Sequence, residues 1–325
     1  MERRGFLKAG GLALAALRAK PAVGGLERPA AALARTLDSA ALVCVRLRGG
    51  ADALGLAAPY ADPDYAALRP TLALPPPDAR APYRLLDLDG HFGLHPAMAP
   101  LLPHFRRGRL AIVHGVGAPI PLAGHGEAQA FADGAGPGGA PRRGWLDRLA
   151  QELAHPLPVL HPRGGDLADR LRALASRMRT DPALRLGAVD SAGWDTHLHE
   201  VVPLADRAAE LAHALSTFMD ELGPRADDVV VLVVSEFGRA VRENASGGTD
   251  HGHGGLALVL GEPVRGGRVL GPRAPLGSSE GAGSGVSTDL RGLVAGLAAR
   301  HLGAANAGAL FPGLTSPDAR PLRLV

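Results

Sequence analysis

The chain has 325 residues, a formal net charge of +3 and a sequence pI of about 9.5. Its basic residues are scattered rather than clustered, so we expect no nucleic-acid partner. The last lysine is Lys20 and the one cysteine is Cys44, which excludes a phosphate-loop lysine, a lysine base, an intrachain disulfide and a cysteine-rich metal site from the body of the chain.

The first 25 residues have the pattern of an export signal. The segment RRGFLK at 3–8 precedes a short apolar run at 9–17. Paired arginines before such a run are typical of twin-arginine signals, and the run is too short to span a bilayer comfortably; an amphipathic first helix is the alternative. We therefore expect residues 1–25 to direct export to the periplasm through the twin-arginine translocation machinery. No clean cleavage site follows the apolar run. A leader that is not removed would attach the chain to the membrane.

The elements that follow predict one α/β domain over residues 35–325. Five apolar, β-branched runs predict strands at 41–47, 110–114, 184–189, 228–234 and 256–260. Helical patterns fall at 96–107, 144–154, 166–179, 198–222 and 289–302. Because the strands lack polar alternation, we expect a mostly parallel sheet with helices on both faces. Cys44 lies within the first strand and is expected in the core.

Acidic and histidine residues gather where these strands end. They are Asp52 after the first strand, Asp195, His197 and His199 after the third, Glu236 after the fourth, and Asp250 and His251 just before the fifth. Ligands bind at the carboxyl ends of strands in open α/β sheets, and the glycine-rich loop 246–255 could return the last pair to that edge. Each residue alone is more typical of a turn, a cap or a solvated loop. Together they predict a metal site.

The residue types indicate which ion this site would hold. Asp, Glu and His without Cys suit Zn²⁺ or Mn²⁺, as one or two ions. Arg48 and Arg239 stand beside the acids and are candidates for binding the anionic oxygens of a substrate. GSSEG at 277–281 fits a serine-hydrolase pattern but lacks the strand before it and the helix after it. Asp190 is expected to be a strand-end turn acid rather than a ligand.

With these residues in place, the chain resembles a known bacterial family. The segments that carry the resemblance include LRGGADAL at 47–54, GWDTH at 193–197, SEFGR at 235–239, GTDHGHGG at 248–255 and STDLRGLVAGL at 287–297. They are similar to the exported domain of unknown function 1501 family, related to the alkaline-phosphatase-like superfamily of phosphatases and sulfatases. The resemblance implies an alkaline-phosphatase-like fold, one metal held by Asp52 and another by Asp195 with His199 or His197. It also implies roles for Glu236 and His251, with Asp250 beside them.

One departure from that family affects the expected chemistry. The family usually shows Ser-His-Phe where this chain reads Gly124-His125-Gly126, and its serine matches the region of the superfamily's nucleophile. Residues 115–129 contain no Ser, Thr or Cys. Thr249 is the nearest hydroxyl by motif, and we interpret it as a turn residue. Two hypotheses follow: an exported metal-dependent hydrolase of phosphate or sulfate esters that uses a metal-bound water, or a non-catalytic metal-binding accessory protein that works with another exported protein.

Overall fold

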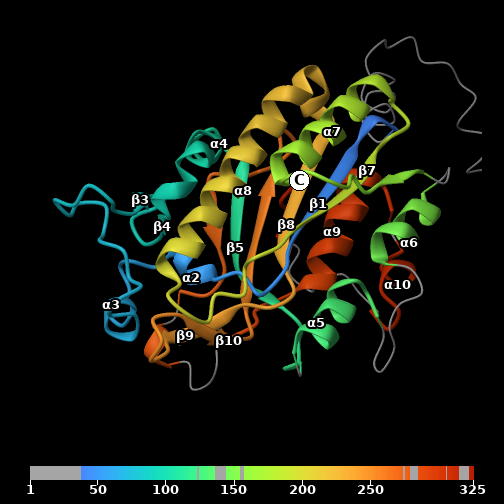
Figure 1. The fold of residues 1–325 in the computed structure, drawn as a ribbon. Coiled ribbons are helices and arrows are strands. Elements are labelled where there is room, and N and C mark those ends of the chain that lie inside the picture. Colours follow the sequence, from blue (N-terminus) through green and yellow to red (C-terminus); the bar gives the residue numbers. More distant parts are fainter. Residues whose placement is uncertain are drawn as a thin grey trace, which may run out of the picture. The chain divides into compact units, whose positions relative to one another are not determined.

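The computed structural model describes residues 38–122, 124–135, 144–153, 157–273, 275–278, 285–304, 306–314 and 322–325. From Ser39 to Val325 the chain forms one compact unit, drawn as a ribbon in Figure 1. The predicted export signal at 1–25 lies outside the described residues. Within them, we find no helix that combines the length and the apolar character needed to cross a membrane.

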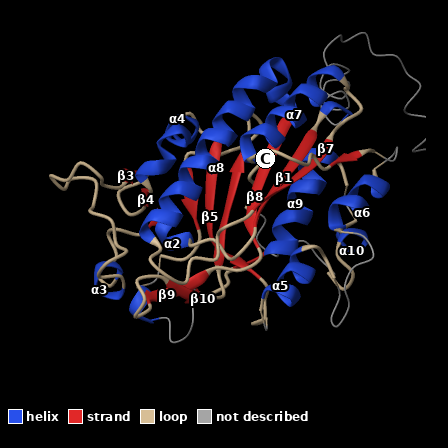
Figure 2. Cartoon of the chain, viewed as in Figure 1, coloured by secondary structure: helices blue, strands red, loops and turns tan. Residues whose placement is uncertain are grey.

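Strands and helices alternate along this unit, and Figure 2 separates them by colour. The strands are β1 (Ala41–Leu47), β2 (Ala57–Ala58), β3 (Leu86–Asp87), β4 (Gly93–Leu94), β5 (Leu110–Gly117), β6 (Val159–Leu160), β7 (Leu186–Ser191), β8 (Val229–Ser235), β9 (Arg239–Glu243), β10 (Thr249–His251), β11 (Gly255–Leu260), β12 (Arg268–Leu270) and β13 (Thr288–Asp289). The α-helices are α2 (Ala53–Leu56), α3 (Tyr65–Leu68), α4 (Leu102–Arg106), α5 (His125–Ala132), α6 (Trp145–Glu152), α7 (Leu167–Thr180), α8 (Val201–Leu222), α9 (Leu290–Leu302) and α10 (Ala307–Leu310). The 3-10 helices are η2 (Pro96–Leu101), η3 (Gly223–Asp228) and η4 (Leu276–Ser278).

All five predicted strands and all five predicted helices form near their expected places. The helix expected at 96–107 is divided into η2 and α4, and Pro100 lies within η2. A proline removes a backbone donor and crowds the preceding turn, which explains why this segment does not begin as a regular α-helix. α8 begins at Val201 rather than at 198, and this difference bears on the site below.

The main sheet has eight strands in the order β12-β5-β11-β8-β1-β7-β6, with β13 also paired to β5. β11 runs antiparallel to both of its neighbours, β5 and β8, whereas the other pairings are parallel. The sheet is therefore mixed. The predicted α/β class is confirmed, whereas a mostly parallel sheet is not. A strand buried on both faces is a continuous apolar run, and such a run does not reveal the direction of the strand.

Helices cover both faces of the sheet, as Figure 1 shows. Along β1, Val43 and Val45 face a core shared with α7 and α8, whereas Leu42 and Cys44 face a second core shared with α6 and α9. Burial on both sides explains the absence of polar alternation in this strand. Cys44 is a core residue, as predicted, and burial raises the pKa of its thiol to about 12.

Two small sheets were not predicted. β9 and β10 form an antiparallel hairpin, and β2, β4 and β3 form the other sheet. Arg69, which follows α3, connects the segment between β2 and β3 to this hairpin, because its guanidinium donates to the carbonyl oxygens of Ala240 and Val241 in β9. The same guanidinium forms a two-pronged ion pair with Asp52, next to α2.

Candidate metal centre

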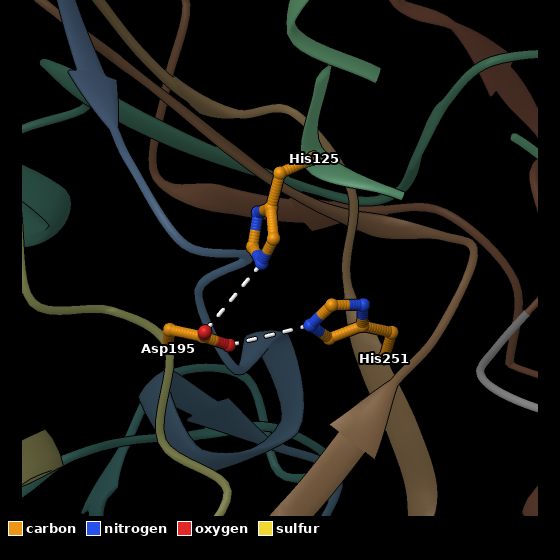
Figure 3. Close-up of side chains that lie close together, drawn as sticks. All are labelled: His125, Asp195 and His251. Atoms are coloured by element: carbon orange, nitrogen blue, oxygen red, sulfur yellow. Dashed lines mark hydrogen bonds and ion pairs between the residues drawn. The ribbon is translucent and has the colours of Figure 1, made fainter. Parts of the chain in front are cut away.

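His125, Asp195 and His251 form a cluster in which both histidine rings face one carboxylate (Figure 3). His125 begins α5 after β5, Asp195 follows β7, and His251 ends β10. Nε2 of His125 lies 3.5 Å from Oδ2 of Asp195, and Nε2 of His251 lies 3.3 Å from Oδ1. Each residue offers one ligand atom, and the three atoms lie within 4.8 Å of one another. Residues more than 120 positions apart in the sequence therefore converge on one point.

The direction of β11 explains how His251 reaches this point. β5 and β7 end at the carboxyl edge of the sheet, so His125 and Asp195 arrive there directly after their strands. Because β11 is antiparallel to β5 and β8, its first residue, Gly255, lies at that same edge. The segment TDHGHG that precedes β11 is thereby placed among the residues that follow the other strands.

Close backbone approach accounts for two glycines near this segment, Gly238 before β9 and Gly252 after β10. A Cβ atom on Gly238 would collide with the backbone of Gly254, and one on Gly252 would collide with the backbone of Arg239. The chain between β8 and β9 and the chain after β10 are thus packed backbone to backbone. Larger residues at these two positions would push the His251 strand away from the cluster.

His197 adds a third imidazole to the cluster. Its Nε2 lies 3.1 Å from Oδ1 of Asp195, and its Nδ1 lies 3.5 Å from Oδ1 of Asp250. The ring centroid of His251 lies 4.5 Å from that of His125 and 4.7 Å from that of His197. Three imidazoles therefore present Nε2 to the carboxylate of Asp195.

Glu236 lies behind His125. Its Oε1 is 3.0 Å from Nδ1 of His125 and accepts hydrogen bonds from the backbone N–H of Gly49, at 2.9 Å, and from Nε2 of Gln129, at 3.3 Å. Burial alone would raise the pKa of Glu236. The hydrogen bonds from its own backbone, His125, Gly49 and Gln129 outweigh this effect and hold the pKa below its ordinary value. The carboxylate is therefore ionised at neutral pH and orients the His125 ring.

Arg239 holds the loops of the cluster together instead of facing solvent. Its guanidinium is fully buried and donates to the carbonyl oxygens of Gly49 and Gly50 after β1, of Trp194 after β7, and of Thr249 in β10. It also forms an ion pair with Asp195. With these donors engaged by the protein itself, Arg239 is not placed to bind an anionic substrate, the role the sequence indicated.

The protonation states in the cluster suit metal binding. Burial would raise the pKa of Asp195, but the hydrogen bond and charge of Arg239, with the contacts of His251 and His197, hold it below its ordinary value. Burial is the main cause that lowers the pKa of His251, which the charges of Arg239 and His125 lower further against the effect of Asp195. A carboxylate and a neutral imidazole are the forms that bind a metal ion. The donor set, nitrogen and oxygen without sulfur, fits zinc or manganese.

Asp52 and His199 are predicted ligands that the structure places differently. Both oxygens of Asp52 are paired with Arg69, at 2.5 and 2.9 Å, and both side chains are buried. His199 has an exposed side chain and a φ of 47°, and no ion pair between described residues includes it. Because α8 begins at Val201, Asp195 and His199 do not share a helix face.

Arg48 is likewise engaged elsewhere. Its Nε lies 3.0 Å from Oδ1 of Asp190, and Arg46 pairs with the same carboxylate at 2.7 Å. Asp133 lies within 4.0 Å of both guanidinium groups. These four residues form a balanced ion-pair group, and the binding of a substrate oxygen by Arg48 stays a prediction.

The sequence pattern missed two groups that belong to the cluster. His125 and Gln129 both lie on α5, a helix of eight residues after a glycine- and proline-rich loop. The signal was present in the Gly124-His125-Gly126 segment, where the family also has a histidine.

Comparison with known families gives one match. Residues 158–290 match the model of a family described as "Protein of unknown function (DUF1501)". The match includes Asp195, His197, Glu236 and His251, but it ends at Leu290, the first residue of α9, and does not reach His125. It supports the family resemblance drawn from the sequence. A comparison with curated proteins gives no match.

Proposed function

We propose that this chain is an exported, metal-dependent hydrolase of phosphate or sulfate esters. The observation that carries the proposal is the convergence of His125, Asp195 and His251, with His197 beside them, at the carboxyl edge of an α/β sheet. Such edges are where ligands bind in open α/β sheets. The ester class comes from the resemblance to the alkaline-phosphatase-like superfamily, and that relationship is part of the proposal.

Asp195, His125 and His251 would hold the ion, with His197 as a fourth ligand. Metal-binding histidines commonly engage their second ring nitrogen with a carboxylate, which fixes the ring orientation. His125 has this arrangement with Glu236, and His197 has it with Asp250. When bound, a divalent ion supplies positive charge for the ester oxygens and lowers the pKa of a coordinated water to about 7.

The lack of an available side-chain nucleophile in two places near the cluster supports attack by water. Residues 115–129 contain no hydroxyl or thiol side chain. Thr249 is fully buried, and its hydroxyl donates a hydrogen bond to Glu200 at 2.7 Å. A substrate at the cluster therefore has no side-chain nucleophile in either place. Hydrolysis by water would be a single displacement, with inversion at phosphorus.

The test is metal content followed by a substrate panel. We expect purified protein to contain a divalent transition metal by elemental analysis and to hydrolyse at least one aryl phosphate or aryl sulfate. Asp195→Ala and His251→Ala should each weaken metal affinity by more than about a hundredfold, beyond the effect of losing an outer-shell partner.

The matched control is His199→Ala, because His199 is close to the cluster in sequence but exposed and outside its contacts. This variant should bind the ion like the wild type. Full metal occupancy in both ligand variants would contradict the proposal. Net retention of configuration on a chiral phosphate ester would contradict direct attack by water, because it would require a covalent intermediate.

A second candidate function is a metal-binding accessory protein without turnover. The observation that favours it is the engagement of both predicted anion-binding arginines: Arg48 pairs with Asp190 and Arg239 is buried among carbonyl oxygens. Tight metal binding with no hydrolysis of any ester in the panel would favour this function over the first.

A further inference from the structure

Glu200 is a fully buried acid that lies next to the candidate centre without belonging to it. It precedes α8, yet its side chain makes no capping hydrogen bond with the helix. Its Oε2 accepts the hydrogen bond from Thr249, whereas its Oε1 has no hydrogen-bond partner. No ion pair between described residues includes it. An ionised carboxylate in such a place would carry a large desolvation cost.

The hydroxyl groups around Glu200 belong to the two segments that carry the candidate ligands. Thr249 stands two positions before His251, and Thr196 stands between Asp195 and His197. Thr196 is buried, and its Oγ1 has no hydrogen-bond partner among the described residues. The hydrogen bond from Thr249 therefore joins Glu200, which follows Asp195 and His197 in the chain, to the segment that carries His251.

Backbone hydrogen bonds hold the same two segments against each other. The N–H of Thr249 donates to the carbonyl oxygen of Thr196 at 3.2 Å, and the N–H of Glu200 donates to that of Gly247 at 2.8 Å. The side chain of Glu200 is therefore fixed at the junction between the segment after β7 and the hairpin of β9 and β10.

Full burial without an ion-pair partner among the described residues favours the neutral form of Glu200. In that form Oε1 carries the hydrogen while Oε2 accepts from Thr249. The charge balance agrees with this state, since burial and the nearby charge of Asp52 both raise the pKa of Glu200, to about 7, against smaller effects of the threonine hydroxyls and Arg69. Arg69 is already paired with Asp52 on two prongs.

We propose that Glu200 is a positioning residue of the candidate centre: its neutral carboxyl group joins the segment after β7 to Thr249 and so fixes the distance between Asp195 and His251. This inference rests on the proposed function, because it takes those two residues as ligands of one ion. Glu200 itself would not contact the ion or the substrate.

The test measures Zn²⁺ affinity of the metal-stripped, full-length protein by competition with a chromophoric chelator. Glu200→Gln presents the same donor and acceptor as the neutral acid, so we expect its affinity to stay within about twofold of the wild type. Glu200→Ala removes the bridge, and its affinity should fall by about tenfold, the lower range for losing an outer-shell partner. Thr249→Val keeps the volume and removes one hydroxyl, and should have the same effect even if the alanine variant folds poorly.

Glu210→Ala is the matched control. Glu210 is also an acid and lies on α8, but it pairs with Arg207 and with the backbone N–H of Leu167. It should bind Zn²⁺ like the wild type. Unchanged affinity in Glu200→Ala and Thr249→Val would overturn the inference and leave the proposed function standing. Equal losses in Glu200→Gln and Glu200→Ala would also overturn it, because the bridge would then require the anion. If the wild type binds no ion, the proposed function fails and this inference fails with it.

Discussion

At the scale of single residues, the candidate centre depends on the two ring nitrogens of His125 and of His197 having different partners. Nδ1 of His125 and of His197 each faces a carboxylate, and Nε2 of each faces Asp195. The carboxylate partner therefore selects which nitrogen is left to bind an ion. The sequence shows only that acids and histidines are near one another, and the pairing of nitrogens with acids is decided by loop geometry.

Glu200 gives a prediction about pH and stability. Its pKa is raised from 4.5 to about 7, first by burial and then by Asp52. The unfolded chain loses this proton near 4.5 and the folded chain holds it until about 7, so the unfolded state binds fewer protons between these values. The free energy of unfolding should therefore fall as pH rises through this window, with a limiting slope of about 1.4 kcal/mol per pH unit for one proton.

Denaturant unfolding of the metal-free protein at pH 5 and pH 7.5 measures this effect. Glu200→Gln cannot lose a proton, so the wild type should lose more stability than this variant between the two pH values. Glu210→Gln should behave as the wild type does. Parallel pH profiles for the wild type and Glu200→Gln would show that Glu200 is ionised throughout.

At the scale of elements, the β9–β10 hairpin holds together the chain segments that form the candidate centre. Arg239 begins β9, and its guanidinium reaches the segments after β1 and β7 as well as β10. A lysine has one point charge and cannot reproduce this planar set of donors. Arg239→Lys should therefore destabilise the fold by about 1–3 kcal/mol, the cost of leaving a buried carbonyl oxygen without its donor, and should lower metal affinity.

Chemical denaturation of the wild type and of Arg239→Lys measures the loss of stability. Arg242→Lys is the control, because Arg242 lies on the same strand with an exposed side chain, and its unfolding free energy should change by less than about 0.5 kcal/mol. If Arg239→Lys is as stable as Arg242→Lys, the hairpin is held by other contacts.

The same elements show how far the sequence could predict the fold. Long apolar runs such as β1 and β8 were found because burial on both faces leaves a clear pattern. β9 reads RAVRE and was missed, since its first residue, Arg239, is a charged side chain buried among loops, which no strand pattern indicates. The direction of β11 was missed because apolar composition is the same for both directions. Asp195 was predicted as a candidate ligand from its place after a strand, whereas the Asp52–Arg69 pair depends on a segment whose path the sequence does not indicate.

At the scale of the whole molecule, export remains a prediction from the first 25 residues. Replacing Arg3 and Arg4 with lysine should block the twin-arginine route, because that pathway reads the arginine pair. Cell fractionation of the double variant should find the chain in the cytoplasm. The matched control is Lys8→Arg, which keeps the charge and leaves the pair intact. Normal periplasmic amounts of the double variant would show that the leader works in another way.

The central place of β11 has a consequence for how the chain folds. Among the described strands, β11 joins β5 to β8, and Leu110 pairs with Leu260, which lies 150 positions later in the chain. Until β11 is synthesised, β8 has an open edge and β5 has no place beside it, and contacts of such long separation form slowly. His125 follows β5 in the chain, so we expect it to meet Asp195 once β11 has joined the two parts of the sheet. Metal uptake would then report the pairing of β11, and a nascent chain halted before residue 255 should bind none.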